Sequence, residues 1–229
     1  MSAYCITGAN RGIGLELARQ AAASGARVFA CARNPAGSAE LQRLAADSDG
    51  RVRVIELDVR SETSIAAAAD ALKGEAIGTL INNAGIMGSR RTPLQTESDE
   101  FMDIMRVNVL GPTLVTRALL PNLRAAKDAK VAVISSLMGS FRYDTTSYIA
   151  YSTSKTAVNR MFHALAREVS GDGIRVAILS PGWVRTDMGG PNAPLSVDES
   201  ARGLLREIAR TDTALSGEFR EYNGGALTW

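Results

Sequence analysis

Residues 7–14 are Thr-Gly-Ala-Asn-Arg-Gly-Ile-Gly, and they stand between an apolar run at 3–6 and a helical pattern. This order predicts a strand, a glycine turn and a helix. Glycine has no Cβ, so the backbone can turn tightly and approach a pyrophosphate, which the free N–H groups of a helix N-terminus attract. The spacing G-x-x-x-G-x-G differs from the usual dinucleotide fingerprint, and an ordinary glycine-rich turn is an alternative on these residues alone.

Strands and helices are predicted to alternate through the rest of the chain. Further strand-like runs lie at 28–32, 52–57, 79–82, 131–135 and 174–179, and a helical pattern separates each from the next. This alternation predicts an α/β fold, a doubly wound, Rossmann-like parallel sheet of about seven strands with helices on both faces. No repeat or linker divides residues 1–229, so we expect a single domain.

Composition argues against several classes of protein. The net charge is +2, from 26 basic and 24 acidic residues without a basic run, which gives no support for binding nucleic acid or a membrane surface. The first strand leaves no space for a signal peptide and no apolar run is long enough to span a membrane, so a cytoplasmic protein is expected.

The cysteine and histidine residues argue against further classes of protein. Cys5 and Cys31 fall in predicted strands, where free cysteines usually act as small buried hydrophobes, and two cysteines make neither a disulfide framework nor a metal site. His163 is the only histidine and no G-x-S-x-G motif accompanies it, which argues against a Ser-His-Asp hydrolase.

Two predicted helices, 97–126 and 150–169, are apolar on more than one face. One face can cover the sheet, and the other needs a second partner. We expect a symmetric contact between copies of the chain, giving a homodimer or homotetramer through these helices; a thick core is the alternative.

Tyr151 and Lys155 lie four residues apart in the second of these helices and therefore share a face. A tyrosine has an ordinary pKa of about 10, and a nearby ammonium is expected to lower the pKa by favouring the phenolate. Such tuning suits acid–base catalysis. A Tyr-x-x-x-Lys pair also arises by chance, so the pair needs support from its surroundings.

That support comes from the strand ends, where open α/β sheets bind ligands. Ser135 and Ser136 follow one predicted strand, and Asn82-Asn83-Ala84-Gly85 follow another. Together with Gly8, Tyr151 and Lys155, these residues resemble the short-chain dehydrogenase/reductase family, in the family's order and over essentially the whole chain. The resemblance implies one NADP-binding oxidoreductase domain, and hydride transfer between a nicotinamide cofactor and a ketone, aldehyde or quinone.

The resemblance also implies a role for each catalytic residue. Tyr151 would protonate the carbonyl oxygen, Ser136 would hold that oxygen, Lys155 would bind the nicotinamide ribose and Asn108 would anchor a water in the proton relay. Ser135 competes with Ser136, which is favoured because the family's serine precedes x-x-Gly, here residues 137–139. The segment 136–151 is a couple of residues longer than in most members.

Most of the implied cofactor-binding residues follow predicted strands, and two lie in the helix 150–169. They are Gly8, Asn10, Arg11, Gly12, Ile13, Gly14, Arg33, Asp58, Val59, Asn83, Ala84, Gly85, Tyr151, Lys155, Pro181, Gly182, Val184 and Thr186. An NAD enzyme would carry an acid at the end of the second strand, where Ala32 stands. Arg33 and Arg11 offer two guanidinium groups for a 2′-phosphate, so NADP(H) is expected; two solvated surface arginines are the alternative.

The end of the chain narrows the resemblance. The chain resembles the C-factor and sniffer carbonyl reductase group at residues 188–191, 217–222 and Trp229. This resemblance implies an alternative function, a signalling or regulatory protein with incidental turnover. Ser196 and Glu199 predict a capping box that starts a helix early, leaving a short lid and an open cleft. Met138, Trp183 and Met188 are candidates for its apolar lining, and each also suits a plain core position.

Pro112 lies four residues after Asn108 in the predicted helix 97–126. Proline has no N–H, so the α-helical hydrogen bond to the Asn108 carbonyl cannot form. We expect that carbonyl to accept a bond from the relay water; a bend of the helix around the sheet is the alternative.

Overall fold

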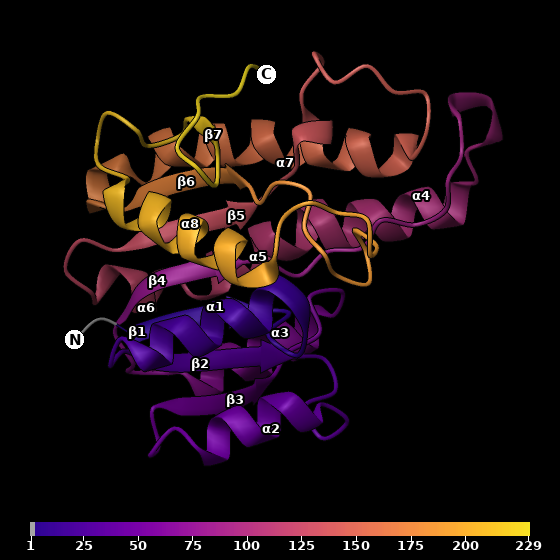
Figure 1. Ribbon diagram of the computed structural model, residues 1–229. Coiled ribbons are helices and arrows are strands. Elements are labelled where there is room, and N and C mark those ends of the chain that lie inside the picture. Colours follow the sequence, from indigo (N-terminus) through magenta and orange to yellow (C-terminus); the bar gives the residue numbers. More distant parts are fainter. Residues whose placement is uncertain (1–2) are drawn as a thin grey trace.

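Seven parallel strands form one sheet in the computed structural model, which describes residues 3–229. The strands are β1 (Ala3–Thr7), β2 (Arg27–Ala32), β3 (Val52–Glu56), β4 (Ile77–Asn82), β5 (Lys130–Ile134), β6 (Arg175–Ser180) and β7 (Phe219–Glu221). Their order is β3-β2-β1-β4-β5-β6-β7 (Figure 1). The chain therefore winds outward in both directions from β1 and β4, which is the doubly wound arrangement, and the predicted fold class is confirmed.

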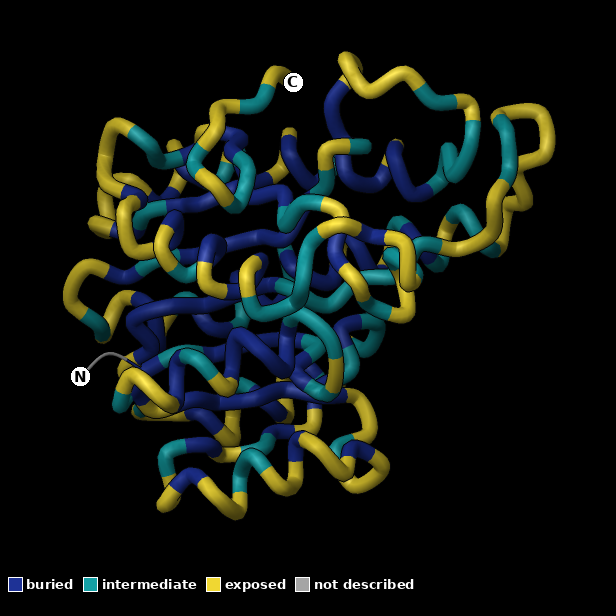
Figure 2. Tube along the Cα trace, in the orientation of Figure 1, coloured by how far each residue is buried: buried dark blue, intermediate teal, exposed yellow. Residues whose placement is uncertain are grey.

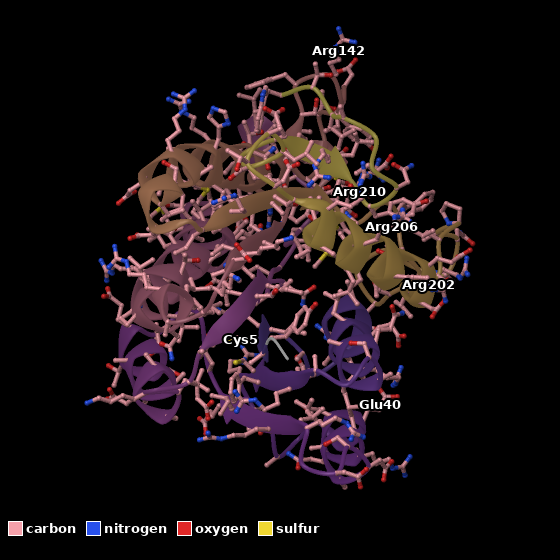
Figure 3. The ribbon with its side chains drawn as sticks, turned by 90° about the vertical axis from the view of Figure 1, so that its left-hand side faces the viewer. Cys5, Glu40, Arg142, Arg202, Arg206 and Arg210 are labelled. Atoms are coloured by element: carbon pink, nitrogen blue, oxygen red, sulfur yellow. The ribbon has the colours of Figure 1, made fainter. Side chains whose placement is uncertain are left out.

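The strands are buried on both faces, as expected for a parallel sheet between helices. β4 is buried along its whole length, and β2 is buried except at Arg27. Cys5 and Cys31, on neighbouring strands, are free thiols without solvent exposure, and their Sγ atoms lie 3.6 Å apart. Figure 3 shows Cys5 inside the sheet. Both cysteines act as small buried hydrophobes, as predicted.

Helices cover the two faces of the sheet in two groups. Leu17, Leu41 and Leu204 pack one face with α1 (Gly12–Ala23), α2 (Ala39–Ala46) and α8 (Val197–Arg210). The other face carries α3 (Glu62–Ala71), α5 (Gly111–Ala118), α6 (Leu120–Arg124) and α7 (Ile149–Glu168), through residues such as Val115 and Phe162. The buried residues accordingly follow the strands and the inner sides of the helices (Figure 2).

Residues 97–126 form several helical pieces, so the prediction of one continuous helix was wrong. The pieces are α4 (Ser98–Met105), a π-helical turn (Arg106–Leu110), α5 and α6. Gly111 donates its N–H to the carbonyl of Arg106, five residues back. Pro112, which lacks an N–H, follows directly, and Pro121 stands in the first turn of α6. The helical hydrogen bonding is therefore adjusted around Asn108, which lies inside the π-helical turn.

Helix α8 begins where the sequence predicts. The Ser196 hydroxyl accepts a hydrogen bond from the Glu199 N–H, and the Glu199 carboxylate accepts one from the Ser196 N–H, which makes the predicted capping box. Arg202, Arg206 and Arg210 lie along one side of α8 (Figure 3). Only residues 181–196 separate β6 from α8, so the segment available to cover the strand ends is short.

Three short 3₁₀ turns complete the chain: Pro93–Gln95, Leu137–Gly139 and Ser170–Asp172. The second of these directly follows Ser136 and leads into the loop before α7. Tyr148, the last residue of that loop, has a left-handed backbone (φ 53°) as it enters α7.

Candidate active site

The predicted site residues gather at the carboxyl edge of the sheet. The strands run parallel, so Thr7, Asn82, Ile134 and Ser180, which end β1, β4, β5 and β6, all lie at that edge. The glycine turn, residues 83–85, Ser136 and the turn at Pro181 follow these strand ends directly. The edge includes the point between β1 and β4 where the winding reverses, the usual position for a ligand in such a sheet.

The glycine turn is tightly built against the end of β4. Gly8 has φ +66°, and a Cβ on Gly14 would lie 2.2 Å from the Gly8 carbonyl oxygen. Asn83 donates through Nδ2 to the carbonyls of Thr7 and Gly8, while the Thr7 hydroxyl accepts the N–H groups of Asn83 and Ala84. These bonds hold the turn in one shape and explain why glycine is needed at both positions.

The turn opens onto the N-terminus of α1. Arg11 is the N-cap, makes no side-chain cap, and no acidic residue occupies the first turn, so free N–H groups remain for an anion. Asn10 and Ile13 are partly exposed beside it. A Cβ at Gly14 would collide with the Gly8 carbonyl and the Asn83 side chain that shape the turn, and the free N–H groups suit a pyrophosphate. The described residues therefore fit a dinucleotide cofactor.

The residues implied for the adenosine end lie beyond β2 and β3. Ala32 is buried, and Arg33 is exposed without an ion pair among residues 3–229. Asp58 accepts the N–H of Arg60 through Oδ1, and Val59 packs against Gly111. Arg11 forms an ion pair with Asp187. Arg33 is therefore open to a ligand, whereas Arg11 already has a carboxylate partner.

Tyr151 and Lys155 project from the first turns of α7 into the same region and are 8% and 5% exposed. The Lys155 Nζ lies 5.4 Å from the centre of the Tyr151 ring and donates to the Ile134 carbonyl at 2.8 Å. A Cβ on Gly85 would lie 3.6 Å from Nζ, so the ammonium faces the segment after β4. α7 therefore brings both side chains to the ends of β4 and β5.

Burial controls the pKa values of this pair. It raises the pKa of Tyr151 to about 12, and a hydrogen bond with Ser136 acts in the opposite direction. Burial also lowers the pKa of Lys155 to about 8. The expectation that the Tyr151 pKa is lowered is therefore wrong for this structure, because the loss of solvent raises it and only Ser136 acts against that rise. The phenol is protonated at neutral pH, as a proton donor must be.

The two candidate serines have different partners. Ser135 is buried, and its hydroxyl donates to Asn159 Oδ1 at 2.5 Å. Ser136 is partly exposed, and its Oγ accepts the N–H of Met138 at 3.1 Å. Since Ser136 also acts on the pKa of Tyr151, it is the serine that shares a surface with the phenol.

Asn108 is held by three hydrogen bonds of its side chain. Oδ1 accepts the N–H of Ile86, and Nδ2 donates to the carbonyl of Ile86 and to Ser154 Oγ. These bonds fix the π-helical turn against the segment after β4. Both Nδ2 hydrogens are used, whereas Oδ1 can still accept one more hydrogen bond.

A sequence model described as short chain dehydrogenase matches residues 2–194. The chain belongs to the short chain dehydrogenase family. It is 37% identical over 154 residues to the C-signal protein of Myxococcus xanthus, covering 67% of this chain and 93% of that protein.

Solved structures agree over the full length of this family member. The carbonyl reductase Sniffer of D. melanogaster has a TM-score of 0.93 and 30% identity, covering 100% of both chains. An NADPH-bound carbonyl reductase from chicken fatty liver also has a TM-score of 0.93, with 32% identity, covering 100% of this chain and 99% of that one. The resemblance seen in the sequence, to the family and to its sniffer-like branch, is confirmed.

Hydrogen bonds fix the backbone of the predicted short lid, residues 181–196 between β6 and α8. Trp183 is largely exposed, and its Nε1 donates to the Gly189 carbonyl, while Thr186 Oγ1 accepts the Gly189 N–H. Val184 is buried, and Ser200 from α8 donates to the Pro181 carbonyl. The lid of this family member therefore holds exposed apolar side chains on a fixed backbone. Met138 and Met188 lie outside the buried core as well.

Sequence reasoning missed three buried polar residues of this site. Ser154 accepts from Asn108 and donates to the Tyr151 carbonyl at 2.7 Å. Asn159 holds Ser135, and Thr7 holds residues 83 and 84. Ser154 and Asn159 lie three and eight residues after Tyr151, so their helical position was a usable signal, but their partners are far away in the sequence.

Among residues 3–229, no group of three or more His, Cys, Asp or Glu side chains is placed to hold a metal ion. None of the helices formed by these residues combines the length and the apolar character needed to cross a membrane.

The main-chain carbonyl of Asn108 remains a prediction. We expect a high-resolution structure with NADPH to show a water that joins this carbonyl to Lys155 Nζ, because Pro112 supplies no N–H to it. In a π-helical turn the competing donor is the amide five residues on, which is that of Thr113. A bond from the Thr113 amide to the carbonyl, without such a water, would contradict the prediction.

Proposed function

We propose that this family member reduces a ketone, aldehyde or quinone to the alcohol with NADPH. The observation that carries the proposal is the meeting of a protonated, buried Tyr151 with Ser136 and Lys155 at the strand ends, beside a glycine turn that fits a pyrophosphate. The similarity to two carbonyl reductases, one of them NADPH-bound, supports the same reaction.

NADPH, when bound, supplies the hydride that adds to the carbonyl carbon. Ser136 donates a hydrogen bond to the carbonyl oxygen and orients it toward the phenol. Tyr151 transfers its proton to that oxygen as negative charge develops there. Lys155 binds the nicotinamide ribose, and its ammonium stabilises the phenolate that the transfer leaves behind.

The test is a measurement of NADPH oxidation by the purified chain against a panel of quinones, aldehydes and ketones. Turnover of at least one class, dependent on enzyme concentration, is the expected result. NADPH binding without turnover across the panel would instead favour a second candidate, a signalling or regulatory protein. The similarity to the C-signal protein is the observation that keeps this candidate in view.

We expect the cofactor to be NADP(H) rather than NAD(H). Ala32 leaves no carboxylate at the end of β2, and Arg33 is exposed next to it without an ion pair among residues 3–229. A guanidinium that binds a 2′-phosphate contributes charge-assisted hydrogen bonds, so NADPH should bind about 10-fold or more tighter than NADH. Titration of both cofactors measures this ratio, and equal or tighter NADH binding would refute the preference.

We also propose a homodimer or homotetramer through α4–α5 and α7. Met102, Leu110 and Met161 are 59%, 50% and 42% exposed on these elements, which places large apolar side chains in water on a monomer. Light scattering coupled to gel filtration should give the mass of two or four chains. Met161→Glu should shift the mass toward the monomer, because it puts a charge into the contact; a parent that is already monomeric would refute the proposal.

A further inference from the structure

An ion pair joins the glycine turn to the lid. Arg11 Nη1 lies 2.5 Å from Asp187 Oδ2, although the two residues are 176 positions apart, and both side chains are well exposed. Next to this pair, a Cβ on Gly12 would lie 3.4 Å from the Thr186 methyl carbon. The Thr186 side chain therefore lies against the glycine turn, and the ion pair is part of a wider contact between the two segments.

Asp187 is held in place by the turn around it. The Gly190 N–H donates to the Thr186 carbonyl at 2.8 Å, and the Gly189 N–H donates to Thr186 Oγ1 at 3.1 Å. Trp183 Nε1 donates to the Gly189 carbonyl at 2.8 Å. The backbone on both sides of Asp187 is therefore fixed, and the exposed side chains of Asp187 and Arg11 can separate without a change in the fold.

Because of this ion pair, the Asp187 carboxylate and the 2′-phosphate of a bound cofactor would compete for Arg11. This step rests on the proposed function, in which Arg11 and Arg33 bind the 2′-phosphate of NADP(H). Arg33 is ready for that role, but Arg11 can bind a phosphate fully only by leaving Asp187. A phosphate dianion binds a guanidinium more strongly than one carboxylate does, and exposed ion pairs are weak, so the exchange is favourable.

We propose that Asp187 is a specificity-determining residue, which competes with the 2′-phosphate for Arg11. NADPH binding exchanges the carboxylate of Asp187 for the phosphate, and NADPH release restores the ion pair. Asp187 therefore loosens NADPH and has no such effect on NADH, which lacks the phosphate. The lid itself thereby moderates the preference for NADPH that the two arginines create.

The test is the dissociation constant of each cofactor for Asp187→Asn and for the parent chain, measured by calorimetry at about 50 mM salt. We expect Asp187→Asn to bind NADPH about 2- to 5-fold tighter, the range that an exposed pair allows, and to bind NADH as the parent does. The gain should shrink at about 0.5 M salt, because the interaction is screened.

Two further variants sharpen the test. Asp172→Asn removes a carboxylate from another exposed arginine pair, with Arg124 at the end of α6, and should leave both constants unchanged. In an Arg11→Ala background, Asp187→Asn should have no effect on NADPH, since the residue under competition is gone. Thermal unfolding of each variant confirms that it is folded.

The outcomes separate this inference from the proposed function. A parent chain that does not bind NADPH refutes both. Suppose that the parent binds NADPH. If Asp187→Asn then binds NADPH more weakly than the parent or equally well, only the exchange is refuted. The exchange is also refuted if Asp187→Asn tightens the binding of NADH as much as that of NADPH. A gain that persists in the Arg11→Ala background would also refute it.

Discussion

Tyr151→Phe is expected to lower kcat for carbonyl reduction by about 100-fold or more, the contribution usual for a positioned acid. The Tyr151 phenol is protonated at neutral pH, burial raises its pKa further, and Ser136 adjoins it. Phenylalanine keeps the ring and its packing but cannot give a proton to the carbonyl oxygen. The measurement is steady-state reduction of the best substrate from the panel.

The same variant should bind NADPH with an unchanged dissociation constant, because the ring stays in place and Lys155 still bonds to Ile134. Tyr148→Phe is the matched control: it makes the same chemical change three residues earlier, at the entry to α7, and should stay close to the parent in kcat. Activity of Tyr151→Phe within a few-fold of the parent would exclude Tyr151 as the acid. Loss of NADPH binding would point to a structural effect instead.

The features that the sequence predicted are those with a local or periodic signal. The sheet follows from apolar runs that alternate with helical patterns, and the capping box at Ser196 follows from one residue spacing. Tyr151 and Lys155 share a face because they lie four apart in a helix. Each of these inferences needs only neighbours along the chain.

The features that the sequence did not predict depend on contacts between distant residues or on burial. The pair of Arg11 with Asp187 and the bond of Ser135 to Asn159 join segments whose approach only the folded chain determines. The break at Asn108 shows the same limit, since Pro112 indicated a bend but not a π-helical turn. The pKa of Tyr151 rises because the fold removes solvent, an effect that the spacing to Lys155 does not reveal.

Lys155→Met is expected to lower kcat/KM by about 100-fold or more and to weaken NADPH binding by about 10-fold. The variant keeps the length of the side chain but removes the ammonium that would bind the ribose and stabilise the phenolate. Its effect on binding separates it from Tyr151→Phe, which should affect turnover alone. Activity and binding near those of the parent would remove Lys155 from the mechanism.

The pKa of Lys155 predicts how the rate of reduction and the stability of the chain depend on pH. Because that pKa is about 8, reduction by the parent should decline as the pH rises through about 8, and Lys155→Met should lack this decline.

The pKa of Lys155 in the folded chain is below the ordinary value of 10.5, so the folded chain holds fewer protons than the unfolded chain between about pH 8 and 10.5. Burying the charged lysine therefore costs stability below pH 8, and the cost fades as the pH rises. At pH 7 Lys155→Met should unfold at the same temperature as the parent or higher, and a clearly lower temperature would mean that the lysine supports the fold rather than the reaction.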